Sequence, residues 1–194
     1  GIKGTLPVTL PPIDEGTLDP PGEKVKDLFE DFFGDIDDGD KFEGIAITLN
    51  EADSSQGVWQ YNTGGKTWYE VGAVSPDNAL LLDKDSKLRF LPVDNYNGAP
   101  GPLCVHVVDD SDRRLDFTDK GRKEFFDTVN DDHTSEVSDT FLKLYTQIGE
   151  LNDSPVAEDD YILSDEDTLL AGNVFDDNSN GPDYDPDGDP FTLT

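Results

Sequence analysis

The sequence predicts an all-β fold, a two-sheet β-sandwich, and three observations support this prediction. Short apolar, β-branched and aromatic runs recur along the chain, and Gly, Asn, Asp and Pro separate them. Two aromatic runs, 58–61 and 67–71, flank Asn62-Thr63-Gly64-Gly65-Lys66, which is a strong hairpin signal. No apolar run approaches the length of a membrane span. Short strands at this density favour a sandwich.

The elements are expected in the following chain order. TLPVTL at 5–10 makes a first strand that two prolines end. Residues 25–33 place apolar side chains at spacings of three, four, seven and eight, which fits one helix face, and Gly34 ends that helical turn. Leu142, Leu144, Thr146 and Ile148 share one face of the last expected strand. The later strands are expected at 45–49, 58–61, 67–71, 79–82, 87–91, 103–108 and 140–148.

The stretch 111–139 interrupts this rhythm and is the small helical insertion of the predicted fold. Thr118 is expected to cap a helix over 120–129. A plain sandwich needs only a short connection here, and long loops with structure of their own are often functional. The stretch holds five of the chain's 14 basic residues, Arg113, Arg114, Lys120, Arg122 and Lys123. Arg113, Arg114, Lys120 and Arg122 are the candidate ligand-binding residues, although pairing with local acids is the other interpretation.

The net charge of −30, with 34% hydrophobic residues, lies near the boundary at which a chain cannot bury enough apolar surface to fold. The acids fall in short clusters beside Gly, Asn and Pro, a pattern that suits Ca²⁺, which takes six to eight oxygen ligands. The charge argues against nucleic acid and against anionic membranes. Because such clusters need millimolar calcium to fill, we expect an extracellular protein.

Three acidic groups are candidate calcium sites. In the first, 35–43, Gly39 permits the sharp turn that convergence requires. The second, 183–189, matches the opening of an EF-hand loop, but its flanks are not helical, so we expect calcium in a β-turn instead. The third joins 109–112 with 152–153 if both preceding strands end at the same pole as the first turn. Solvated acidic loops without metal remain the alternative for each group. The candidate ligands are Asp35, Asp37, Asp38, Asp40, Glu43, Asp109, Asp110, Asp112, Asn152, Asp153, Asp183, Asp185, Asp187 and Asp189.

The remaining chemical groups favour structural roles. The hairpin aromatics Trp59, Tyr61, Trp68 and Tyr69 could stack on a sugar, but period-two alternation places about half of them in the core. Cys104 fits a small core residue, because one cysteine cannot form an internal disulfide. Neither His106 nor His133 has a catalytic partner at useful spacing, and no nucleophile elbow or phosphate loop occurs. We therefore expect no enzyme.

An acidic signature occurs twice, at 13–48 and at 164–194. Each copy has an acidic turn, a Leu/Phe segment, clustered carboxylates and a short β-prone run. A repeat at this spacing indicates tandem domains. We expect a calcium-binding sandwich at 1–150, a linker at 149–160, and the opening of a second repeat within 151–194, all belonging to a longer protein.

Four segments together resemble a known family. DIDDGD followed by GIAIT, GVWQYNTGGKTW, LRFLPVDNYNG and LNDSPVAEDD resemble the cadherin-like, calcium-binding repeats of bacterial RTX adhesins, which type I secretion exports. The resemblance spans about 13–194 and implies an Ig/cadherin-like β-sandwich at the bacterial cell surface. It also implies that Asp35, Asp37, Asp153, Asp185 and Asp187 are calcium ligands.

The resemblance leaves three functions open. The leading hypothesis is a calcium-dependent module that attaches the cell to a protein or peptide on a host or neighbouring cell. The first alternative is a structural extender that calcium stiffens between adjacent repeats. The second is a carbohydrate-binding module that uses the aromatic hairpin.

Overall fold

The structure, a computed structural model, describes residues 7–34, 39, 41–110, 115–129, 137–138, 140–161, 163–169, 171–173 and 181–192. The chain divides into two compact units, the N-terminal unit Gly1–Glu150 and the C-terminal unit Leu151–Thr194. No helix among these residues is long and apolar enough to cross a membrane.

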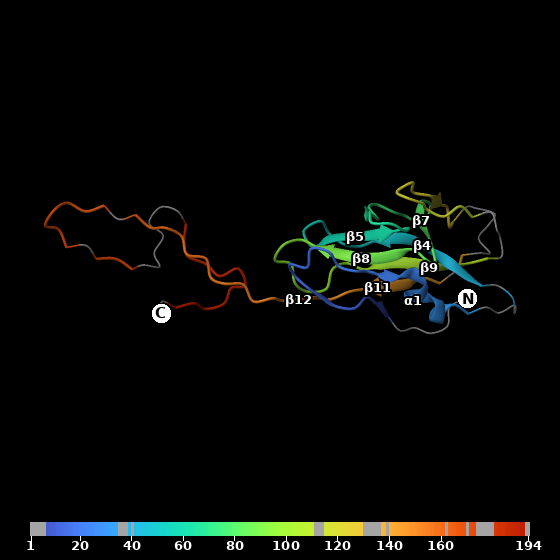
Figure 1. The fold of residues 1–194 in the computed structure, drawn as a ribbon, viewed down its shortest axis with the longest axis horizontal. Coiled ribbons are helices and arrows are strands. Elements are labelled where there is room, and N and C mark those ends of the chain that lie inside the picture. The colour runs from blue at the N-terminus through green and yellow to red at the C-terminus, as the bar shows by residue number, and fades with distance from the viewer. Residues whose placement is uncertain are drawn as a thin grey trace. The chain divides into compact units, whose positions relative to one another are not determined.

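The N-terminal unit is a β-sandwich with one short helical segment, as the sequence predicts (Figure 1). The helical segment comprises α1 (Val25–Phe29) and the 3-10 turn η1 (Glu30–Phe32). The strands are β1 (Val8–Thr9), β2 (Ile13–Asp14), β3 (Glu23–Lys24), β4 (Phe42–Asn50), β5 (Gly57–Asn62), β6 (Tyr69–Glu70), β7 (Ala79–Asp83), β8 (Lys87–Pro92), β9 (Leu103–Asp109), β10 (Phe125–Phe126), β11 (Leu142–Tyr145) and β12 (Ile148–Gly149).

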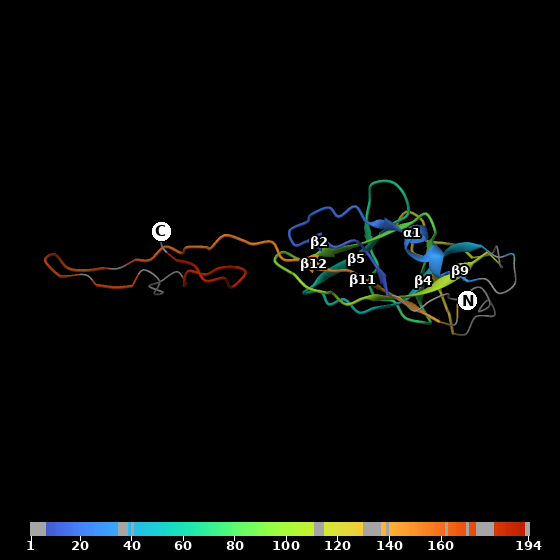
Figure 2. The same ribbon diagram turned by 90° about the horizontal axis from the view of Figure 1, so that it is seen from below.

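Two main sheets form the layers of the sandwich. The larger has the order β1-β11-β9-β4-β7-β10, and the smaller has the order β3-β8-β5-β6. Parallel pairing joins β1 to β11, whereas the other strand pairs of these two sheets are antiparallel. A third sheet pairs β12 with β2, which lie side by side in Figure 2. The predicted strand 140–148 therefore divides between two sheets. The four residues predicted to share one of its faces, Leu142, Leu144, Thr146 and Ile148, are all buried.

The core lies between the two main sheets. Trp59 and Tyr61 of β5 are fully buried and pack with Phe90 of β8 and with Ile45 and Ile47 of β4. The Trp59 ring meets Phe90 edge-on at 5.2 Å between centroids, and its Nε1 donates to the Gly101 carbonyl at 2.8 Å. The predicted hairpin is confirmed by the pairing of β5 with β6. Its two fully buried aromatic rings are core residues.

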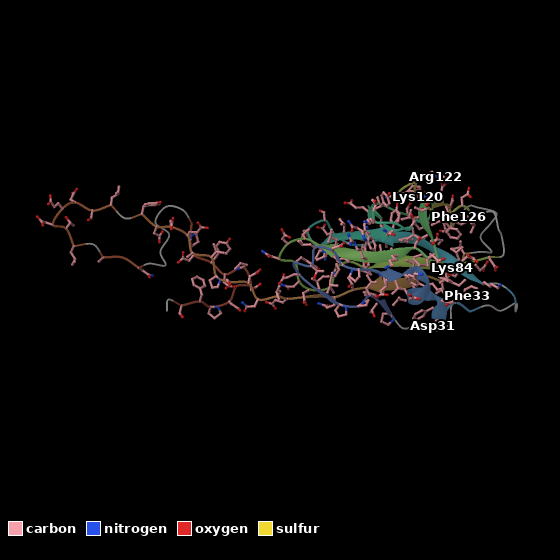
Figure 3. All side chains as sticks on the ribbon, viewed as in Figure 1. Asp31, Phe33, Lys84, Lys120, Arg122 and Phe126 are labelled. Carbon is pink, nitrogen blue, oxygen red and sulfur yellow. The ribbon has the colours of Figure 1, made fainter. Side chains whose placement is uncertain are left out.

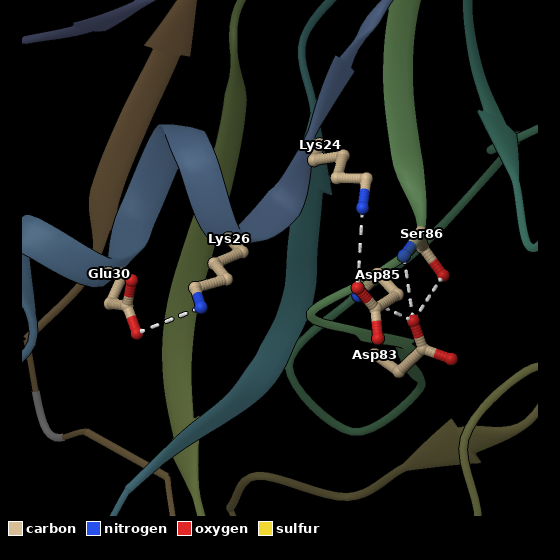
Figure 4. A network of polar contacts seen from close by, with 6 residues as sticks. All are labelled: Lys24, Lys26, Glu30, Asp83, Asp85 and Ser86. Atoms are coloured by element: carbon tan, nitrogen blue, oxygen red, sulfur yellow. Dashed lines mark hydrogen bonds and ion pairs between the residues drawn. The ribbon is translucent and has the colours of Figure 1, made fainter.

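The predicted helical turn at 25–33 is confirmed. Val25 and Phe29 are fully buried, so the apolar face of α1 packs into the same core. Beside α1, the turn between β7 and β8 is closed by Asp83, whose Oδ1 accepts hydrogen bonds from Ser86 N at 2.7 Å and Asp85 N at 2.9 Å (Figure 4). Lys24 forms an exposed ion pair with Asp85 at 3.5 Å.

Residues 115–129, together with Val137, cover the outer face of the larger sheet. There Ala46, Leu81 and Val108 form a second apolar cluster with Phe126, and Phe117 packs against it. The other members of this cluster are Ala79, Val137 and the partly buried Leu115. The described part of the insertion is therefore largely a cover for apolar strand residues that would otherwise meet water.

A glycine in β4 makes room for this cover. A Cβ atom at Gly44 would lie 2.8 Å from the Phe117 ring and would collide with the Leu82 carbonyl oxygen. Only glycine allows the cover to approach the strand so closely.

The prediction of a helix at 120–129 is wrong. Lys120 and Gly121 have positive φ angles of 46° and 81°, and backbone hydrogen bonds in both directions between Asp119 and Arg122 close a tight turn. The following Phe125–Phe126 strand then pairs with β7. Thr118 caps no helix, because its Oγ1 accepts a hydrogen bond from Glu124 N across this turn. The edge of β7 offers a pairing partner and an apolar surface, and both outweigh a weak helical periodicity.

Candidate functional site

Five of the predicted calcium ligands and two of the predicted ligand-binding residues lie outside the described residues. They are Asp35, Asp37, Asp38, Asp40, Asp112, Arg113 and Arg114. The structure gives positions for the others, which fall into an acidic strand end, an acidic turn in the C-terminal unit and a basic turn.

The acidic strand end lies where β4 begins and β9 ends. Phe42 is the Cα partner of Asp109, so the chain that follows the predicted turn at 35–40 enters the sheet beside Asp109. Asp110 Oδ1 accepts a hydrogen bond from Lys41 N at 2.7 Å. Glu43 binds Lys84 at 3.0 Å, and this hydrogen bond raises the pKa of Lys84. Glu43, Asp109 and Asp110 thus gather at one end of the sheet, but Lys84 already holds one oxygen of Glu43.

β9 and the last strands end at opposite ends of the sheet, contrary to the condition on which the third predicted site depends. Leu144 pairs with Leu103 and Leu142 pairs with Val105, so β11 runs antiparallel to β9. The chain therefore passes from β11 to β12 beside the first residue of β9, at the end of the sheet away from Asp109. Antiparallel neighbours necessarily end on opposite sides. The condition for a site shared between 109–112 and 152–153 is not met.

The acidic turn in the C-terminal unit is organised by Asp185. Its Oδ1 accepts hydrogen bonds from Asp187 N at 3.0 Å and Asp189 N at 3.2 Å, and its carbonyl accepts one from Gly188 N at 3.0 Å. Gly188 has a φ of 75°, a conformation that glycine adopts without strain. An aspartate that binds the backbone two residues ahead is a common way to close a turn.

A second segment of the same unit joins this turn. Asp153 N donates to Asp187 Oδ2, and Glu158 N donates to Asp183 Oδ1 at 2.9 Å. An isolated antiparallel β-bridge between Val156 and Tyr184 lies between these two hydrogen bonds. Of the residues predicted to bind calcium, Asp153, Asp183 and Asp187 are therefore brought together with the Asp185 turn.

The oxygen donors of the acidic turn are of the kind that calcium prefers. One oxygen each of Asp185 and Asp187 accepts backbone N–H groups, and the other oxygen of each accepts no hydrogen bond within the described part of the chain. Across the described residues, no group of three or more His, Cys, Asp or Glu side chains is arranged to hold a metal ion. The donor type fits calcium, and calcium binding remains a prediction.

The C-terminal unit has an extreme charge composition. Its 44 residues include 13 Asp and Glu and no Lys, Arg or His, so every basic residue of the protein belongs to the N-terminal unit. No side chain of this unit can therefore neutralise its carboxylates.

The basic turn contains Lys120 and Arg122, which both project from the cover (Figure 3). Arg122 pairs with Glu124 at 3.0 Å. The Lys120 backbone N donates to Thr63 Oγ1 at 2.9 Å, which docks the turn on the β5–β6 hairpin, while the Lys120 ammonium forms no ion pair with any described residue. Lys123 Nζ donates to the Val71 carbonyl at 2.7 Å, and burial lowers the pKa of Lys123.

The sequence pattern did not identify Arg89 as a candidate site residue. It lies in the middle of β8 between two buried apolar neighbours, and its guanidinium stacks 4.1 Å from the ring centre of the half-buried Trp68. Arg89 Nε donates to Gln60 Oε1 at 2.8 Å, and Nη1 donates to the Pro20 carbonyl at 2.8 Å and to Asp19. The signal was present, because an arginine within an apolar strand needs partners when it is buried.

A pocket opens beside Arg89. Its cavity volume is about 50 Å³, within about 320 Å³ of space that is partly open to solvent, and its walls are mostly apolar. They come from the N-terminal strands, the Pro20-Pro21-Gly22 segment, β8 and the segment after β11. The lining includes Leu10, Pro11, Ile13, Phe90 and Thr146.

Comparison of the chain with protein-family models, with curated proteins and with solved structures finds no match. The inference of function therefore depends on the residues and their arrangement.

Proposed function

We propose that this chain is a calcium-dependent, ligand-binding module of a bacterial surface adhesin. The observation that carries the proposal is the composition of the C-terminal unit, which holds 13 acidic residues and no Lys, Arg or His. Its acidic turn, built by Asp185 and Asp187, gathers carboxylates that repel one another. A divalent cation offsets this repulsion, and binding to the folded state alone stabilises that state.

The ligand-binding part of the proposal is supported by the basic turn. Lys120 is a cation without an ion pair in the described part of a strongly acidic chain, and its turn is fixed to the hairpin through Thr63. A lysine on a docked turn, with an ammonium group that forms no ion pair with the described residues, suits an acidic group on a protein or peptide partner. Arg113 and Arg114 precede this turn in sequence and remain candidate ligand-binding residues.

The structural extender is the second candidate, and one specific observation favours it. Phe126 and Phe117 of the insertion cover the outer face of the larger sheet, which gives the insertion a structural purpose without any ligand. The carbohydrate-binding alternative has less support, because Trp59 and Tyr61 are fully buried and Arg89 covers Trp68.

The calcium part is tested by titrating metal-free protein with Ca²⁺ in a calorimeter. Asp185→Asn and Asp187→Asn should each weaken binding at one site by tenfold or more, about 1.4 kcal/mol. Asp165→Asn is the matched control, since Asp165 lies in the same unit, is exposed and uses only its backbone carbonyl in described hydrogen bonds. Equal heats for all four proteins would refute the assignment.

The ligand-binding part is tested on an immobilised peptide array that contains acidic and neutral sequences. Binding should require calcium and should weaken in Lys120→Ala and Arg113→Ala, with an unchanged melting temperature. Lys24→Ala, which removes a cation held in an exposed pair with Asp85, should bind as the unmodified protein does. If none of these variants loses binding, the extender hypothesis is favoured.

A further inference from the structure

The pocket beside Arg89 has rigid walls. Pro11, Pro20 and Pro21 have fixed φ angles, so these parts of the wall have little conformational freedom to lose when a ligand binds. Gly22 has a φ of 65°, and a Cβ atom there would lie 2.6 Å from the Trp68 ring. The proline segment is therefore pressed against Trp68, and a pocket built in this way is formed before its ligand arrives.

The two partners of the Arg89–Asp19 ion pair differ in their exposure to solvent. The Arg89 side chain is 7% exposed, whereas the side chain of its carboxylate partner, Asp19, is 87% exposed. A well-solvated carboxylate gives up little when it leaves such a pair, because its charge is already surrounded by water. The guanidinium would stay in place, since Gln60, the Pro20 carbonyl and Trp68 hold it independently of Asp19.

We propose that this pocket binds a small organic carboxylate with an apolar body. The carboxylate takes the place of Asp19 on the Arg89 guanidinium, and the hydrocarbon part lies against Ile13 and Phe90. A charge-assisted hydrogen bond to a buried arginine is among the stronger polar contacts in proteins. The pocket is small, with about 50 Å³ of enclosed space, which limits the ligand to a compact molecule.

This site goes beyond the proposed adhesin function and does not depend on it. No predicted calcium ligand and no residue of the basic turn lines the pocket. The pocket lies within the N-terminal unit, so binding should persist in chelator while the sandwich stays folded. The two proposals can therefore fail separately.

The test uses 4-methylpentanoate as the probe and 4-methylpentanamide as its neutral counterpart. Trp68 stacks on Arg89, so the intrinsic fluorescence of the whole chain should change when the acid binds and should change little with the amide. The change should be lost in Trp68→Phe, because the other tryptophan, Trp59, is buried in the core away from solvent. Calorimetry with both compounds gives the affinities directly.

Asp19→Ala is the decisive variant. It removes the internal competitor and should tighten binding of the acid by about two- to fivefold, the range expected for an exposed ion pair. Asp85→Ala removes an equally charged, exposed residue from its pair with Lys24 and should leave the affinity unchanged. Arg89→Lys keeps the charge but loses the planar fork, and should weaken binding at least tenfold.

Three results would overturn the proposal. They are equal binding of acid and amide, no binding of the acid up to its solubility limit, and an unchanged affinity in Asp19→Ala. If Arg89→Lys does not fold, Asp19→Ala still decides the matter, because Asp19 is almost fully exposed and its loss costs the fold little.

Discussion

The two units of the protein manage the same excess of negative charge in different ways. In the N-terminal unit, acids such as Glu43 and Glu51 pair with lysines at the margin of a continuous apolar core. In the C-terminal unit, acids such as Asp185 and Asp187 accept backbone N–H groups, and no described residue is buried. The first unit has the core and counter-charges of an independent fold. The second has neither, which is why we expect its order to depend on a cation.

The largest effect should come from the core of the N-terminal unit. Trp59→Ala removes a fully buried ring, its contact with Phe90 and its hydrogen bond to Gly101. We expect the free energy of unfolding to fall by about 4–5 kcal/mol, the upper range for loss of a large aromatic side chain. Urea denaturation followed by circular dichroism measures this change.

The control replaces a large apolar side chain of the C-terminal unit by alanine. Leu163 is 97% exposed, so Leu163→Ala should change the same free energy by less than about 0.5 kcal/mol. A loss at Leu163 comparable to that at Trp59 would mean that the C-terminal unit contains a core, and the contrast between the units would fail.

The second prediction concerns the cover on the outer face of the larger sheet. Phe126 is 6% exposed and its neighbour Phe125 is 43% exposed, although both belong to β10. Phe126→Ala should destabilise the N-terminal unit by about 3 kcal/mol, and Phe125→Ala by clearly less. Equal effects in thermal melts would show that the stretch 115–129 does not stabilise the sheet it covers.

These residues also show what the sequence could predict. The strand pattern and the Asn62–Lys66 turn predicted the sandwich and its aromatic core, because period-two alternation and glycine turns are local signals. The role of the insertion could not be predicted in this way. Whether Phe126 continues a helix or pairs with Ala79 depends on a strand edge distant in sequence, which local periodicity does not encode.

The candidate sites show the same difference between groups that are contiguous in sequence and groups that are assembled from distant segments. Clusters such as Asp183–Asp189 are contiguous, so their oxygen donors were recognised from spacing, and the Asp185 turn gathers part of them. Arg89 was missed because its partners Asp19 and Gln60 come from two other segments. β9 and β11 end on opposite sides of the sheet because they are antiparallel neighbours. The sequence did not predict which strands are neighbours.

The third prediction concerns calcium and the C-terminal unit. Removing calcium should release the repulsion around Asp185 and Asp187 and open this unit to proteases near 150–160. At a calcium concentration of 100 times the dissociation constant, binding adds about 2.7 kcal/mol to the stability of the bound state. Limited proteolysis with and without chelator measures the cleavage rate. Equal rates would mean that the acidic turn is ordered without a cation.

The smallest effect should come from a single pair of the kind that the C-terminal unit lacks. Lys143 Nζ donates to Glu51 Oε1 at 2.8 Å, and this hydrogen bond lowers the pKa of Glu51 below its ordinary value of 4.5. Because the folded pKa is the lower one, the pair contributes its full stability above pH 4.5. That contribution is lost as the pH falls through the folded pKa, where the native carboxylate also becomes protonated.

A double-mutant cycle isolates this contribution. Glu51→Gln, Lys143→Met and the double variant should show a small favourable coupling in melting temperature near neutral pH, below each of the effects above, since half-exposed pairs contribute little. The coupling should decline as the pH falls below 4.5 and vanish once the pH lies below the lowered pKa of Glu51 in the folded protein. Coupling that persists in acid would show that the two side chains interact through packing. The distinction between charge pairing in one unit and backbone or cation neutralisation in the other would then lose one of its supports.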